Sequence, residues 1–345
     1  MRYYPKIDGL RCIAICAVLL HHLGGFSNYV NLGYFGVDLF FVISGFLITL
    51  LLLKSQGSFK KAYSHFLARR ALRIFPLYYF ALLILYLVTQ PIVKDNMVYL
   101  LTYTFNYRLP FISDGNPVRY LWSLSLEEQY YLFWPLFVLA LKNCPKLLMA
   151  LVSFIIVFGY VQLHFNIIPS ISIYNYTGLA TRMGSLGFGS FGAMLFLQQS
   201  KYLDYLLCNK YIEYCMLVFW LFAIFLLNPF LIGIGSLYMV LKAANNSFQL
   251  QKINKLLVHR KVLYIAKISY GLYVYHIIVI YYLTPYMFDP FFLNINFEML
   301  GPFKILRWHS WIVKLPLYFS VTIILSDLSY RYFEKPFLKL KRYFV

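Results

Sequence analysis

The chain has 345 residues, of which 61% are hydrophobic and only 12% are charged. So few charges cannot cover the surface of a soluble domain of this size, and apolar runs of membrane-spanning length recur from end to end, so the sequence predicts a multi-span membrane protein. The formal net charge of +19 does not indicate nucleic-acid binding, because the basic residues fall in loops between the apolar runs.

Ten apolar segments are long enough to cross a membrane as helices. We expect them at residues 10–26, 33–53, 73–90, 121–141, 146–164, 178–197, 211–227, 229–244, 264–283 and 311–329. The expected fold is therefore an all-α, polytopic transmembrane bundle of about ten helices, with residues 1–345 forming one integral-membrane domain. Because ten is even, both termini should lie on the same side of the membrane.

The distribution of basic residues assigns that side. Twenty-three of the 31 Lys and Arg residues fall in the terminal segments and in alternate loops counted from the N-terminus, whereas six fall in the opposite loops. Cytoplasmic loops carry the excess of Lys and Arg in membrane proteins. The asymmetry therefore predicts that both termini are cytoplasmic.

The first expected span carries ionisable side chains, which are costly inside a membrane and usually face a protein interior or a wet cavity. On a helix, the eleven residues from Arg11 to His22 turn through about 1100°, so the two side chains point within about 20° of the same direction, about 16 Å apart along the axis. His21 points about 80° away. The pattern predicts a polar helix face that links one membrane surface to His22.

Two arginines, Arg70 and Arg73, stand three residues apart where the loop after the second span ends. If the helix has begun there, they share one face, and their guanidinium groups suit phosphate binding. Binding to anionic lipid headgroups is the alternative interpretation.

The fourth span begins with two adjacent acids, Glu127 and Glu128. Glu127 would enter the membrane from the outer side near the expected level of His22, so it is a candidate to orient or charge-stabilise the imidazole. Two structural alternatives stay open: a carboxylate solvated at the interface, or a helix N-terminus capped by Ser123 or Ser125 with an acid in its first turn.

Four of the other ionisable residues inside expected spans are candidates for a functional or pairing role. His276 in the ninth span stands among tyrosines, where a hydrogen-bonded structural histidine is the alternative to a catalytic one. Asp38, Arg182 and Asp327 should find opposite charges, and we expect Asp38 or Asp327 to pair with Arg11 or Arg182.

Small residues and cysteines carry structural signals. Small residues at Ser44 and Gly45, and four glycines of the sixth span, suit close helix packing; those glycines are Gly184, Gly187, Gly189 and Gly192. The five cysteines have neither CxxC nor zinc-site spacing, so no metal or redox site is expected.

Five motifs in a fixed order resemble the acyltransferase type 3 family of membrane O-acyltransferases. They are Asp8-Gly-Leu-Arg11 with ten residues before His22, followed by Gly36-Val-Asp38-Leu-Phe-Phe-Val-Ile-Ser44-Gly45-Phe-Leu-Ile; Arg70-x-x-Arg73 with Pro76; Trp122-Ser-Leu-Ser-Leu-Glu127-Glu-Gln-Tyr-Tyr; Ser269-Tyr-Gly-Leu-Tyr-Val-Tyr-His276; and Arg331-Tyr-Phe-Glu334-Lys-Pro336. The resemblance covers essentially the whole chain.

The resemblance implies a bacterial, multi-pass enzyme of the cytoplasmic (inner) membrane that moves an acyl group, usually acetyl, from cytoplasmic acyl-CoA to a hydroxyl of a cell-surface glycan or glycolipid. It makes Arg11 and His22 essential, assigns donor binding to Arg70 and Arg73, and favours Glu127 over Glu128. Some relatives append a soluble esterase-like domain; the sequence ends at Val345, just after its last span, so any second catalytic step should come from another protein or be absent.

The expected mechanism uses His22 as the base for the acceptor hydroxyl, since a neutral imidazole can accept a proton. Arg70 and Arg73 would bind the acyl-CoA phosphates together with Lys60, Lys61 and Arg69, and Asp38 or Glu127 is the candidate to orient the imidazole. Direct transfer and an acyl-histidine relay both begin with this neutral ring and stay open.

We expect three partners: membrane lipids, the glycan acceptor and, as candidates, other glycan-assembly proteins. The alternative function is a transporter or flippase for a lipid-linked saccharide that uses the buried charges as a proton relay, although no internal repeat of the kind common in transporters is visible. A structural subunit of a glycan-assembly complex is a third reading, and it leaves the polar face of the first span unexplained.

Overall fold

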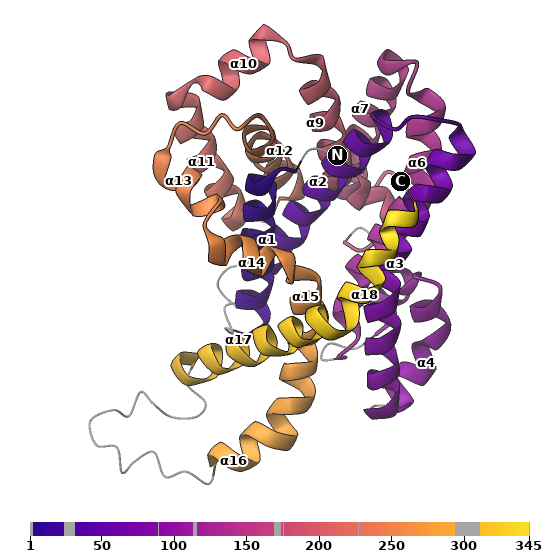
Figure 1. Cartoon of the computed structure of the whole chain (residues 1–345), viewed down its shortest axis with the longest axis vertical. Coiled ribbons are helices and arrows are strands. Elements are labelled where there is room, and N and C mark those ends of the chain that lie inside the picture. The colour runs from indigo at the N-terminus through magenta and orange to yellow at the C-terminus, as the bar shows by residue number, and fades with distance from the viewer. Residues whose placement is uncertain are drawn as a thin grey trace.

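The computed structural model describes residues 3–23, 32–88, 90–112, 116–168, 174, 176–226, 228–293 and 311–344. The protein is 88% helical, and no strand occurs in these ranges, which confirms the predicted all-α class (Figure 1). The longer helices are α1 (Pro5–Leu23), α2 (Leu32–Leu53), α3 (Phe59–Val88), α4 (Gln90–Leu101), α6 (Trp122–Leu141), α7 (Pro145–Phe165), α9 (Leu179–Gln198), α11 (Lys210–Leu226), α12 (Pro229–Asn245), α15 (Ser269–Ile278) and α17 (Trp311–Leu328). The shorter ones are α5 (Phe105–Arg108), η2 (Leu109–Phe111), η3 (Arg119–Leu121), α10 (Lys201–Cys208), α13 (Gln251–Leu257), α14 (Arg260–Lys267), η4 (Val279–Phe288), α16 (Asp289–Leu293), η7 (Ser329–Glu334), α18 (Lys335–Lys339) and η8 (Leu340–Tyr343).

Each expected span is mainly helical over its described residues, and two boundaries differ clearly from the expected ones. Helix α3 begins at Phe59 rather than near residue 73, so Arg70 and Arg73 lie within one continuous helix. The expected span 264–283 is divided, because the helical hydrogen bonding breaks near Ile268 between α14 and α15. The basic residues of α14 therefore belong to a separate short amphipathic helix.

Several helices have the length and apolarity that a membrane crossing requires. In the described ranges, four helical stretches meet both conditions: Leu32–Leu53, Phe59–Val88, Pro145–Phe165 and Ser269–Phe291. Helices α10 and α11 meet them together, although they are bent by 73° relative to each other. These apolar helices identify a membrane protein.

Helices α2 and α9 pack closely at the centre of the bundle because both carry glycine at the contact. A Cβ atom at Gly45 would lie 2.0 Å from the carbonyl oxygen of Leu186, and one at Gly189 would lie 2.0 Å from that of Val42. No larger residue fits such an approach without moving the backbone. The close packing predicted for Gly45 and for the glycines of the sixth span is confirmed at these two positions.

A buried ion pair joins the same two helices. Arg182 Nη1 on α9 donates to both carboxylate oxygens of Asp38 on α2, at 3.0 and 3.2 Å, and Ser185 Oγ donates to the carboxylate at 2.8 Å. Arg182 Nε donates to the carbonyl oxygen of Tyr176 at 2.8 Å. One of the expected pairings, Asp38 with Arg182, is confirmed.

The other expected pairings are replaced by local ones. Arg11 pairs with Asp8 on its own helix at 2.8 Å, and Asp327 pairs with Arg331 at 2.8 Å. An ion pair between residues three or four positions apart on a helix needs no long-range packing. Asp327 also accepts a hydrogen bond from the Tyr264 hydroxyl.

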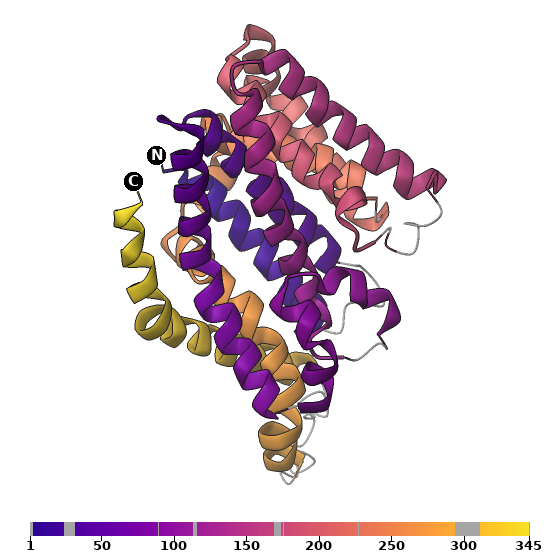
Figure 2. The same ribbon diagram turned by 90° about the vertical axis from the view of Figure 1, so that its right-hand side faces the viewer.

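The two ends of the chain lie beside each other. Figures 1 and 2, viewed 90° apart, both place the end of η8 near the start of α1. In both views α18 runs beside the first half of α3. Figure 2 shows α3, α18 and the N-terminus on one side of the molecule.

Candidate active site

Helix α1 presents Arg11 and His22 from one continuous helix, as expected from the sequence. Its Asp8-Gly9-Leu-Arg11 motif has a packing role, because a Cβ at Gly9 would lie 2.4 Å from the carbonyl oxygen of Leu257 at the end of α13. Lys6 Nζ also donates a hydrogen bond to Asn254 Oδ1 on α13. The motif thus holds α13, and the α14 helix that follows it, against the Arg11 end of α1.

His22 pairs with His276 at the other end of α1. The Nδ1 atom of His22 lies 3.1 Å from Nε2 of His276, and the Nδ1 atom of His276 lies 2.7 Å from the carbonyl oxygen of Tyr273. The His276 ring is fully buried, whereas the His22 side chain is exposed. Sequence reasoning named both histidines, but only the fold brings these residues, 254 positions apart, into contact.

The hydrogen-bond chain assigns the protons of the two rings. A carbonyl oxygen can only accept, so Nδ1 of His276 carries a proton, and in a neutral ring its Nε2 is then an acceptor. His22 Nδ1 must therefore donate to that atom. The remaining nitrogen of His22, Nε2, keeps its lone pair and can take a proton from a substrate hydroxyl.

Glu127 shares a cavity with Arg11, Arg70 and Arg73 and does not contact His22. This glutamate cavity, of about 90 Å³, is lined by Arg11, Val37, Phe40, Phe41, Ser44, Arg70, Arg73, Ile74, Ser123, Leu124, Glu127, Tyr131, Ser269, Tyr270 and Tyr273. Glu127 accepts hydrogen bonds from Ser44 Oγ at 3.1 Å and from the Tyr131 hydroxyl at 3.0 Å. The expected contact of Glu127 or Asp38 with the His22 ring is absent, and His276 takes that place.

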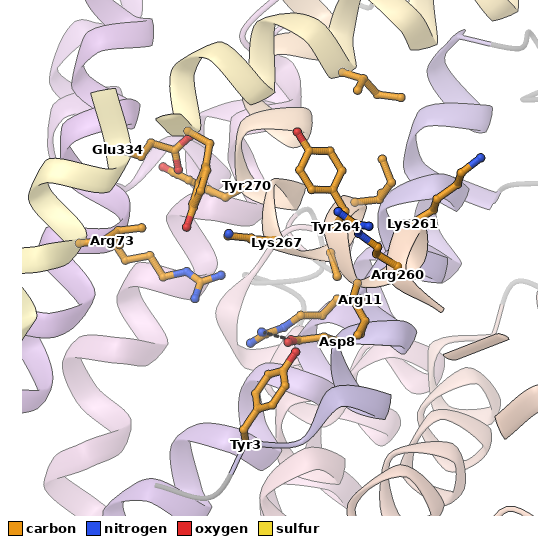
Figure 3. A pocket seen from close by; sticks show the side chains of 16 residues that line it. Tyr3, Asp8, Arg11, Arg73, Arg260, Lys261, Tyr264, Lys267, Tyr270 and Glu334 are labelled. Carbon is orange, nitrogen blue, oxygen red and sulfur yellow. Dashed lines mark hydrogen bonds and ion pairs between the residues drawn. The ribbon is translucent and has the colours of Figure 1, made fainter. Parts of the chain in front are cut away.

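A larger cavity opens beside the glutamate cavity. This basic cavity, of about 1010 Å³, is lined by Tyr3, Asp8, Arg11, Arg73, Arg260, Lys261, Leu263, Tyr264, Ile265, Ala266, Lys267, Tyr270, Ile323, Tyr330, Glu334 and Leu338. In Figure 3 the guanidinium groups of Arg73 and Arg11 point toward its centre from opposite helices. Arg11, Arg73 and Tyr270 line both cavities, so these three side chains form the boundary between them.

Tyr273 connects the glutamate cavity to the histidine pair. Its ring lines the cavity, and its backbone oxygen accepts from His276 one turn further along α15. The Tyr273 hydroxyl is itself fixed by Ser123 Oγ, at 2.5 Å, and by the carbonyl oxygen of Tyr120, at 2.7 Å. His22 lines neither cavity, and the histidine pair lies one helical turn beyond the glutamate cavity.

Burial shifts the pKa of two groups outside the spans, both close to the arginines of α3. Burial raises the pKa of Glu334 to about 7, although a hydrogen bond from Ser329 and the charge of Arg73 favour its carboxylate. Burial, followed by repulsion from Arg73, Arg70 and Arg69, lowers the pKa of Lys341 to about 7. The second shift thus reflects burial first and then the three arginines in the middle of α3.

Sequence reasoning therefore found most of this region and missed part of it. It named Arg11, Arg70, Arg73 and Glu127, which the fold brings to one cavity, while Asp38 belongs to the separate ion pair with Arg182. It missed the basic residues of α14 at the larger cavity. Their helical spacing was visible in the sequence, but the predicted span 264–283 put Arg260 in a loop and Lys267 in a membrane helix.

Comparisons with known proteins agree with the motifs. A family model described as "Acyltransferase domain" (Acyl_transf_3) matches residues 4–331, and the chain belongs to this acyltransferase family. Its match covers nearly all of the described helices, from α1 to η7.

Two curated relatives are similar along almost the whole chain. The chain is 29% identical over 373 residues to "Putative peptidoglycan O-acetyltransferase YrhL" of Bacillus subtilis, covering 97% of the chain and 55% of that protein. It is 28% identical over 372 residues to "Peptidoglycan O-acetyltransferase OatA" of Listeria monocytogenes, covering 98% of the chain and 56% of that protein. The chain thus spans little more than half the length of these relatives. No solved structure shows a significant match.

Proposed function

We propose that this protein is a membrane O-acetyltransferase that transfers an acetyl group from cytoplasmic acetyl-CoA to a hydroxyl of a cell-surface glycan. Family membership supports acyl transfer, and the names of the two relatives support O-acetylation of peptidoglycan or a related saccharide. The observation that carries the proposal is the His22–His276 pair, which leaves one imidazole nitrogen available as a base on the helix that also bears Arg11.

In the proposed reaction, His22 Nε2 takes the proton from the acceptor hydroxyl while its oxygen attacks the thioester carbonyl. The carbon–sulfur bond then breaks, and the leaving thiolate receives the proton back from the His22 imidazolium. His276 accepts from His22 Nδ1–H throughout and stabilises the positive ring. In a covalent relay, the same nitrogen would attack the thioester first and pass the acetyl group to the hydroxyl in a second step.

Arg11 and Arg73 support a route for the donor. They stand between the basic cavity and the glutamate cavity, and the rise from Arg11 to His22 is about 16 Å along α1. An extended pantetheine arm is of this order, so a nucleotide held near Arg11 would bring its thioester toward the histidine pair. Arg70 adds a third guanidinium group along this route.

We also propose ten spans, cytoplasmic termini and a position in the bacterial cytoplasmic membrane. Each expected span is mainly helical over its described residues, and the adjacent chain ends (Figure 2) are compatible with an even number of crossings. The excess of Lys and Arg in alternate segments supports the orientation. In this proposed orientation the basic cavity lies on the cytoplasmic side, where acyl-CoA is available.

The test uses the purified protein with radiolabelled acetyl-CoA and a saccharide acceptor. Wild-type protein should move the label to the saccharide, whereas His22→Ala and Arg11→Ala should lower the rate at least about 100-fold, as expected when an acid–base group or its donor clamp is lost. Membrane expression should be unchanged, and His164→Ala, which removes an exposed histidine, serves as the control. Full activity of either variant would contradict the assignment.

A transporter remains the second candidate because Asp38 and Arg182 are fully buried within the bundle. They pair with each other, Ser185 and Tyr176 complete their hydrogen bonds, and both line a cavity of about 230 Å³. The labelling experiment separates the two functions: a transporter would leave the label on the coenzyme.

A further inference from the structure

Helix α14 presents two basic residues to the basic cavity. Arg260 and Lys267 are seven positions apart, so on a helix they point within about 20° of the same direction. Both line the cavity. In Figure 3 the Lys267 ammonium points into the cavity toward the Arg73 guanidinium, and the Arg260 guanidinium lies on the side away from Arg73. The Lys261 ammonium points away from the centre of the cavity.

The charge of this cavity is not balanced by its acids. Asp8 is paired with Arg11, and Glu334 accepts from Ser329. Within the described ranges no carboxylate lies at ion-pair distance from Arg260, Lys267 or Arg73. Cations that converge on one cavity without such partners produce a strongly positive site, which favours a ligand with several negative charges.

The position of α14 is built into the fold. Gly9 admits the backbone of Leu257, and Lys6 holds Asn254, so the end of α13 is fixed on α1 directly before α14 begins. A helix that served only to attach the protein to lipid headgroups would need no such fixed approach to Arg11. The restraint indicates that α14 is positioned relative to the cavity.

We propose that Arg260 and Lys267 bind the phosphates of the donor nucleotide in the basic cavity, with the pantetheine arm leaving it between Arg11 and Arg73. This inference rests on the proposed acetyltransferase function and identifies where the donor's charged end binds. It differs from the sequence-based expectation, which gave that role to Arg70 and Arg73 together with Lys60, Lys61 and Arg69. Lys61 and Arg69 line a separate cavity with His65 and Phe344.

The cavity fits this ligand in size and composition. A volume of about 1010 Å³ is at the upper end of the range for small-molecule sites, which run from about 300 to 1,000 Å³. Tyr3, Tyr264 and Tyr330 add ring surfaces on which an adenine base can stack. A nucleotide with a long arm therefore finds cations, aromatic surface and an exit toward the glutamate cavity.

The experiment compares two acetyl donors, acetyl-CoA and S-acetylpantetheine, which lacks the nucleotide. Full-length protein in lipid nanodiscs is assayed for binding and for acetyl transfer with Arg260→Ala, Lys267→Ala and the double variant. Lys255→Ala, which removes one exposed charge from neighbouring α13, is the matched control. Each cavity variant should raise the Kd and the KM for acetyl-CoA about tenfold, the effect of one charge-assisted contact, while kcat and the KM for S-acetylpantetheine stay within about twofold.

Two results would overturn the inference. One is an unchanged Kd for acetyl-CoA in the double variant; the other is an equal loss with both donors. Repeating the assay in nanodiscs with and without anionic lipid identifies lipid anchoring, because a loss of activity that depends on anionic lipid and not on the donor would assign Arg260 and Lys267 to headgroups. If wild-type protein neither binds nor consumes acetyl-CoA, the proposed function itself fails; if it does both and the variants match it, only the nucleotide site is wrong.

Discussion

Two polar clusters in this bundle differ in what completes them. The Asp38–Arg182 pair is closed in the sense that its charges are satisfied: the two side chains also line a cavity of about 230 Å³, but they pair with each other, and Ser185 and Tyr176 complete their hydrogen bonds. Arg73 stands at the junction of two cavities, with no carboxylate at ion-pair distance in the described ranges. The difference teaches that a charge satisfied inside the protein serves the fold, whereas an unsatisfied charge facing a cavity indicates a ligand.

The largest expected effect comes from opening the closed cluster. Asp38→Ala would leave the Arg182 guanidinium buried without a counter-charge, which should lower the free energy of unfolding by about 3–5 kcal/mol. The thermal midpoint of the purified protein in detergent measures this loss. Asp204→Ala removes an exposed carboxylate on α10 and should leave the midpoint nearly unchanged. Equal midpoints for both variants would show that the pair does not hold α2 to α9.

The open cluster should respond in the opposite way. Arg70→Ala combined with Arg73→Ala should raise the KM for acetyl-CoA about 30-fold through the loss of two charge-assisted contacts, with little change in thermal midpoint. Acceptor KM should stay the same. Lys60→Ala, which removes an exposed charge from the same helix, is the control. Unchanged donor affinity would assign the two arginines to lipid headgroups.

A smaller effect should follow from the histidine pair. His276→Phe removes the acceptor for His22 Nδ1–H, so kcat should fall about tenfold, the KM values should stay the same and the pH profile of kcat should shift. His276→Gln supplies a side-chain carbonyl and should restore part of the rate. His276 is thus a positioning residue; equal loss in the two variants without a shifted profile would indicate a purely structural role.

The smallest effect concerns pH. Since the pKa of Glu334 is raised to about 7, its side chain is neutral below that pH and adds a negative charge to the basic cavity above it. Affinity for the polyanionic donor should therefore fall about twofold to threefold between pH 6 and pH 8, and Glu334→Gln should flatten this dependence. Donor Kd measured across that range provides the check. A wild-type slope retained by the variant would assign the dependence to another group.

The sequence by itself determined the all-α class, the approximate helix positions and most of the polar residues at the site. Periodicity placed Arg11 and His22 on one face, and the motifs identified Arg70, Arg73 and Glu127. These features are local or depend on composition, because helix formation and the demand for apolar surface act over neighbouring residues.

Only the tertiary structure decided which distant residues meet. It paired His22 with His276, gave Asp38 to Arg182 and brought α14 to the Arg11 end of α1. Contacts between residues far apart in the sequence depend on how whole helices pack, and glycines such as Gly9 and Gly45 set the distance at which they do so. The sequence named the charged groups, and helix packing determined which of them neutralise each other and which remain for a ligand.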